Sequence, residues 1–73
     1  MTTYGERAVG LDFNPSGDPN VHRVKQQFAD IIDQMYELRE AASDGELKRI
    51  ASIAITEAQA AQMWAIKALT WRV

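Results

Sequence analysis

The stretch ASDGE, residues 42–46, decides the fold of this chain of 73 residues. It interrupts two long segments with helical patterns, and it offers Ser43 or Asp44 as an N-terminal cap for the second segment. Glu46 places an acidic side chain in the first turn of that helix, where the macrodipole favours an anion. The sequence therefore predicts two helices joined by a short connection, which makes them antiparallel neighbours.

The helix before this break begins where Asp18 can act as the N-cap and Pro19 can take the first helical position, which tolerates its missing N–H. Apolar residues then recur at steps of three and four, which is typical of a helix packed along one face. We expect this helix over about 19–42. Its predicted seam consists of Val21, Val24, Phe28, Ile31, Met35, Leu38 and Ala42, and Ile32 and Tyr36 widen this seam on one side.

The segment after the break is predicted to be helical over about 45–71, because it is rich in alanine, the best helix former, and has no proline. Its apolar residues exceed what one neighbouring helix can cover. They form two stripes, one of Leu47, Ile50, Ala54, Ala61 and Ala68 and another of Ile55, Ile66, Leu69 and Val73. Apolar surface left over on a small chain is typical of an interface. We therefore expect packed helix–helix contacts at Ala61 and Trp64, and an oligomer of even order.

Residues 1–17 hold three of the four glycines and show no sustained apolar period. We expect an extended N-terminal arm there, with at most a short turn at ERAVG (residues 6–10). The predicted organisation is an arm over 1–17 and a helical hairpin over 18–73, and the predicted fold class is all-α.

Composition excludes several classes of protein. The chain has no cysteine, so disulfides and thiolate metal sites are ruled out. Its net charge of −2 argues against binding duplex DNA. No apolar stretch approaches the roughly 20 residues that span a bilayer, and no signal-peptide pattern is present, so we expect a cytosolic protein. Because no catalytic or metal-ligating set stands out around the single His22, we expect no enzyme activity, metal or cofactor.

The lead-in FNPSGDP, residues 13–19, suggests a ligand site. Phe13 offers a flat face on which a nucleobase can stack. Arg23 and Lys25 lie in the first two turns of the following helix, where the macrodipole would prefer acids, so cations there indicate an anionic ligand. The alternative is a hydrophobic staple, in which Phe13 simply packs on the hairpin.

FNPSGDP followed by a charged helix, together with AQMWAIKALTW at residues 61–71, resembles the phage anti-CBASS sponge family, which shares a helical hairpin with anti-Thoeris sponges. The resemblance covers about Phe13 to Trp71. It implies a phage-encoded protein of the host cytoplasm and a compact homohexamer. Such a protein binds cyclic oligonucleotide second messengers without cleaving them, which leaves the CBASS effector inactive.

The resemblance also implies site residues. The stacking aromatic matches Phe13, with Asn14 and Pro15 beside it, and the phosphate-binding lysine matches Lys25, with Arg23 as the substitute. A 3′,3′-cGAMP-like dinucleotide would then sit between two subunits, each supplying one aromatic and one cation. Loose candidates for a second, trinucleotide site are Gln27 and Lys67. The alternative function is a structural helical-hairpin oligomer that acts as a protein–protein interaction module.

Overall fold

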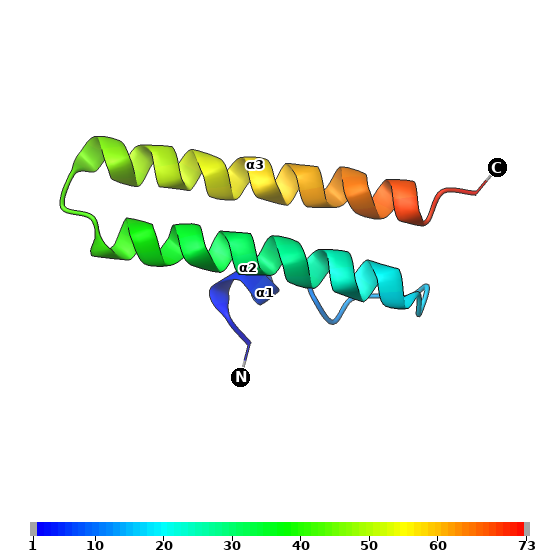
Figure 1. The fold of residues 1–73 in the computed structure, drawn as a ribbon. Helices are drawn as coiled ribbons and strands as arrows, with labels where there is room; N and C mark the ends of the chain where they lie inside the picture. Colours follow the sequence, from blue (N-terminus) through cyan, green and yellow to red (C-terminus); the bar gives the residue numbers. More distant parts are fainter. Residues whose placement is uncertain (1, 73) are drawn as a thin grey trace.

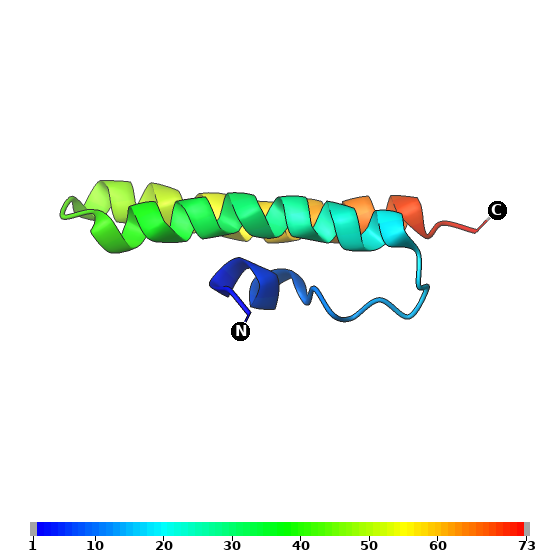
Figure 2. The ribbon, with the colours of Figure 1, turned by 60° about the horizontal axis from the view of Figure 1, so that its bottom comes forward.

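The computed structural model describes residues 2–72, which form three helices: α1 (Tyr4–Val9), α2 (Pro19–Ala41) and α3 (Gly45–Leu69). No strand occurs in this part of the chain, so the predicted all-α class is confirmed for it. α3 turns back along α2 after a short connection (Figure 1), and α1 lies against α2 (Figure 2). Val73, which was expected at the end of the hairpin, lies outside the described residues.

Capping residues set the start of both long helices. The Asp18 side chain accepts a hydrogen bond from the Asn20 N–H at 2.9 Å, with Pro19 in the first turn. The Asp44 side chain accepts from the Glu46 N–H at 3.2 Å. α2 ends one residue, and α3 two residues, before the ends expected from the sequence.

The arm is not extended throughout, because α1 forms within it. The Thr3 hydroxyl accepts from the Glu6 N–H at 3.1 Å, and the Glu6 carboxylate accepts from the Thr3 N–H at 3.0 Å. This reciprocal capping box begins the helix. Gly10 ends it in the left-handed conformation, with φ 61°, which glycine adopts without strain.

α1 is fixed to both long helices. The Tyr4 ring stacks on the Tyr36 ring of α2, with centroids 4.3 Å apart. From α3, the Gln59 side chain donates to the Ala8 carbonyl at 3.4 Å. The buried core is formed by residues of the three helices and of the turn that follows α1. It consists of Val9, Leu11, Ala29, Ile32 and Ile55.

The buried face of α2 agrees with the predicted seam in part, since Val21 is buried and Phe28 and Met35 pack against the core, but it differs at other positions. Ile31 is 52% exposed and Leu38 is 41% exposed, whereas Ala29 and Ile32 are fully buried. The cause is α1, which packs on the Ala29 side of α2. Residues two apart on a helix lie about 200° apart around it, so Ile31 points away from α1. On α3, Ile55 of the second predicted stripe is buried, but the other buried residues, Ala51 and Gln62, lie outside both stripes.

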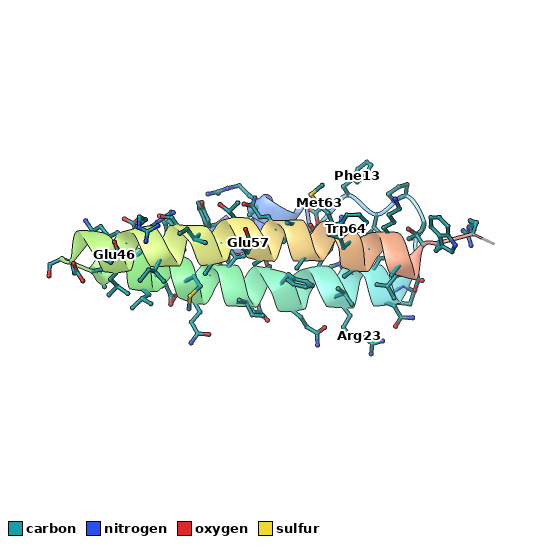
Figure 3. The ribbon with its side chains drawn as sticks, turned by 90° about the horizontal axis from the view of Figure 1, so that it is seen from above. Phe13, Arg23, Glu46, Glu57, Met63 and Trp64 are labelled. Carbon is teal, nitrogen blue, oxygen red and sulfur yellow. The ribbon has the colours of Figure 1, made fainter. Side chains whose placement is uncertain are left out.

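A large apolar surface remains uncovered on the single chain. The Cα atoms span 46 × 28 × 12 Å, so the chain forms a thin, flat layer. Trp64 projects from α3 away from α2 (Figure 3), and Ala61 beside it is exposed. The exposed large apolar residues are Phe13, Ile31, Leu38, Ile50, Ile53, Met63, Trp64, Leu69 and Trp71. None of the three helices is long and apolar enough to cross a bilayer.

Candidate functional site

The lead-in to α2 and the C-terminal end of α3 enclose a cavity of about 220 Å³. Phe13, Asn14, Pro15 and Lys25, four of the five residues expected at the main site, all line it. The remaining wall is supplied by Ser16, Val21, Ile66 and Thr70. The contribution of α3 could not be read from the sequence, because it depends on how far α3 runs back along α2.

Lys25 lies at the bottom of this site and is only 5% exposed. Its ammonium donates to the Gly10 carbonyl at 2.9 Å and also to the Phe13 carbonyl. The Nζ atom lies 5.6 Å from the centroid of the Phe13 ring, within the range of a cation–π contact. No carboxylate pairs with Lys25 in residues 2–72. Within the described part of the chain, the site therefore holds a buried positive charge whose two hydrogen-bond acceptors are both neutral.

Side-chain hydrogen bonds shape the loop that forms the rim. The Asn14 amide donates to the Asp18 carbonyl at 3.0 Å, and the Ser16 hydroxyl donates to the Asn14 side-chain oxygen at 2.7 Å. Gly17 has φ 68°, which allows the chain to turn into the α2 cap. Asn14 thus braces the loop, and Phe13 projects from it with 74% of its surface exposed.

Arg23 does not join this site within one chain. It is exposed and donates to the Asn20 side chain. It lies on the opposite edge of the hairpin from Phe13 (Figure 3). Because Arg23 precedes Lys25 by two residues on a helix, the two cations point in nearly opposite directions. Arg23 therefore does not line this cavity in the single chain, and its role as a substitute for Lys25 stays a prediction.

The two candidates for a second site are not brought together either. Lys67 lines a separate cavity of about 310 Å³ on α3 with Ala60, Met63 and Trp64. Its Nζ atom lies 5.5 Å from the Trp64 ring centroid and 5.8 Å from that of Trp71. Gln27 is exposed on α2 and does not line this cavity. The sequence predicted that Trp64 lies in a packed helix–helix contact, whereas in the single chain the Trp64 ring lies beside the Lys67 ammonium at this cavity.

The described residues contain no group of three or more His, Cys, Asp or Glu side chains that could hold a metal ion. The polar groups at the main site are instead one ammonium, one amide and two hydroxyls, beside one exposed aromatic ring. Such a set suits a ligand that carries both negative charge and a flat ring system.

Comparison with known families agrees with this chemistry. A family model described as "Acb2/Tad1, hairpin domain" matches residues 6–70, which is nearly the whole chain. The chain belongs to the Acb2/Tad1 hairpin family. This is the family of anti-CBASS and anti-Thoeris sponges, so the resemblance found in the sequence is confirmed. No curated protein and no solved structure gives a match to this chain.

Membership of the Acb2/Tad1 family implies a phage sponge for cyclic nucleotides, a binding protein rather than an enzyme. The matched region begins inside α1 and ends at Thr70, so it includes the complete lining of the cavity around Lys25. The family relationship and the cavity therefore concern the same part of the molecule.

Proposed function

We propose that this chain sequesters cyclic dinucleotides of the 3′,3′-cGAMP type in the host cytoplasm and returns them unaltered, so that CBASS effectors lack their activator. The observation that carries the proposal is the buried Lys25 ammonium, which lines a cavity and has no carboxylate partner in residues 2–72. A buried charge is costly unless it is paired. A ligand phosphate would supply the missing negative charge.

The exposure of Phe13 supports stacking over the staple interpretation. A staple requires the ring to be packed on the hairpin, but 74% of Phe13 is open to solvent. Stacking of an aromatic side chain on a base is worth about 1–3 kcal/mol. Phe13 thus provides the face and Lys25 the cation that a nucleotide needs.

The size of the cavity favours a site shared between subunits. At about 220 Å³ it is smaller than the roughly 300–1,000 Å³ typical of pockets that enclose small ligands. A twofold pair of chains would provide two Phe13 rings and two Lys25 ammoniums, which matches the two bases and two phosphates of a cyclic dinucleotide. The uncovered apolar residues of α2 and α3 supply surface for such pairing and for the homohexamer that the resemblance implies.

A cyclic trinucleotide site at Lys67 remains part of the proposal on one condition. Because Gln27 does not line the Lys67 cavity of its own chain, it would have to come from a neighbouring subunit. Trp64 would then be the stacking face of that second site.

Release without cleavage is supported by the residues at the main site. Among residues 2–72, the side chains that line it include no carboxylate and no imidazole, the groups that most often act as a general base. The Ser16 hydroxyl donates to Asn14, and the Thr70 hydroxyl donates to the Ile66 carbonyl at 2.8 Å. Neither hydroxyl is hydrogen-bonded to a base that could activate it for attack on phosphate.

The proposal is tested by incubating the protein with 3′,3′-cGAMP, removing the protein–ligand complex by filtration, denaturing it with heat and chromatographing the released material. A sponge depletes the filtrate and returns intact ligand. Recovery of linear product would instead identify an enzyme. Failure to deplete the ligand at micromolar protein would favour the alternative, a structural oligomer that docks on a protein partner through α3.

A further inference from the structure

We propose that Lys25 is a positioning residue as well as a phosphate ligand: it holds the turn that presents Phe13, so the cation and the stacking ring act as one unit. This inference rests on the proposed function and concerns how the same site is built. It starts from the two hydrogen bonds that the ammonium makes to the Gly10 and Phe13 carbonyls.

These two carbonyls lie at the ends of one turn. The Phe13 N–H donates to the Gly10 carbonyl at 3.0 Å and closes the turn over residues 10–13. Lys25 comes from α2, which is anchored in the core. Its ammonium therefore ties both ends of the turn to a rigid element.

The start of this turn is anchored without Lys25, because Leu11 is buried in the core and the Gly10 and Leu11 N–H groups donate to the Arg7 and Glu6 carbonyls of α1. The end of the turn that carries Phe13 has fewer ties. The ring is mostly exposed, so burial contributes little to its position. The hydrogen bonds of Asn14 and Ser16 brace residues 14–18 and do not reach the turn over 10–13. Among the side chains of residues 2–72, only Lys25 forms hydrogen bonds to that turn.

The ammonium has enough donors for both roles. A lysine side chain carries three N–H donors, and two of them serve the carbonyls of the turn. The third forms no hydrogen bond within residues 2–72 and is available to a phosphate. It follows that removing Lys25 should abolish the anion contact and also loosen the ring, whereas removing the Phe13 ring should leave Lys25 and the turn in place.

Amide hydrogen exchange on the ligand-free protein tests the positioning role directly. In Lys25→Met, which keeps the apolar stem, the Phe13 amide should exchange at least tenfold faster than in the parent. Lys48→Met provides the matched control, because Lys48 is an exposed lysine on α3, and it should leave that amide unchanged. Phe13→Ala should also leave the amide of residue 13 protected. If Lys25→Met does not fold, Lys25→Leu, which also lacks a donor, replaces it. A protected amide in either folded variant overturns the inference.

A double-mutant cycle with 3′,3′-cGAMP tests the coupling. Phe13→Ala removes one ring from each of the two subunits at a shared site, so it should weaken binding by at least about 30-fold, the lower end of the range for stacking on two bases. In the Lys25→Met background the same change should weaken it by no more than about 3-fold, because the ring is already poorly placed. Equal effects in both backgrounds would show that the two residues act independently. If the parent does not bind, the proposed function fails, while the exchange experiment still decides the positioning role.

Discussion

Replacing Gly5 by alanine should detach α1 from the hairpin. Gly5 lies where α1 approaches α2 most closely, and its N–H donates to the Asp33 carboxylate at 2.6 Å. An added Cβ would lie 2.9 Å from both the Ala29 carbonyl carbon and the Asp33 oxygen, and closer still to the Ala29 carbonyl oxygen. The Ala29 atoms in this contact belong to the backbone of a helix at the centre of the core, so they cannot move aside as a flexible side chain could.

Two opposing effects set the magnitude. Alanine favours the helix over glycine by up to about 1 kcal/mol. Overpacking in a close contact costs about 1–3 kcal/mol, and weakening a hydrogen bond to a charged group costs about 1.5–3 kcal/mol. The steric and hydrogen-bond losses outweigh the propensity gain, so Gly5→Ala should lower the free energy of unfolding by about 1.5–5 kcal/mol. For a domain of this size, each kcal/mol corresponds to about 4–8 °C in Tm.

The matched control is Gly45→Ala at the start of α3, where an added Cβ meets no atom within 4 Å. This variant should be as stable as the parent or slightly more stable. Urea denaturation followed by circular dichroism, at one fixed protein concentration because self-association raises apparent stability, measures both. If Gly5→Ala is as stable as Gly45→Ala, α1 does not pack on α2 through Gly5 and the description of the core is wrong.

Three further variants address other parts of the molecule. Phe13→Ala should change the free energy of unfolding by less than about 0.5 kcal/mol, because exposed positions contribute little, while calorimetry should show weaker binding of 3′,3′-cGAMP. Ile53→Glu, on the exposed face of α3, should lower the oligomeric state in light scattering and keep the helix content. A parent-sized assembly would show that this face is not an interface. A hydrogen bond from Arg49 lowers the pKa of Glu46 below its ordinary value of 4.5. The stabilisation from this pair is therefore present above pH 4.5 and is lost as the pH falls through the lowered pKa. The Tm of Glu46→Gln should be lower than that of the parent at pH 7, and the two Tm values should be equal in strong acid.

The sequence was sufficient for the helix starts and for most of the main site, because both depend on local chemistry. Asp18 and Asp44 are N-caps, and each accepts a hydrogen bond from an N–H group two residues further along the chain. Phe13 and Lys25 meet because a short loop leads directly into the first turns of α2. α1 was missed although Thr3 and Glu6 form a recognisable capping box, since six residues give no apolar period to detect.

The buried face of α2 could not be found from periodicity alone. Its sequence carries apolar residues on two adjoining sides, and the choice between them depends on where α1 packs. Contact with α1 buries Ala29 and Ile32 and leaves Ile31 exposed. The burial of Lys25 follows from the same shift, since it lies on the face that includes Val21 and Ala29. A cation on an otherwise apolar face is the signal that could have predicted a site there.

The dependence of binding on salt should separate Lys25 from Arg23 as the cation of the site. The protein has a net charge of −2, so an anionic ligand gains nothing from long-range attraction to the whole molecule. Lys25 is buried, and salt screens buried pairs far less than exposed pairs, for which the Debye length is about 8 Å at physiological ionic strength. Raising NaCl from 50 to 500 mM should therefore weaken 3′,3′-cGAMP binding by less than about tenfold in the parent. The contrary result would be that calorimetry shows affinity falling a hundredfold or more over this range of salt, and that this salt dependence disappears in Arg23→Met but persists in Lys25→Met. It would mean that exposed cations bind the phosphates and that the buried ammonium only holds the turn.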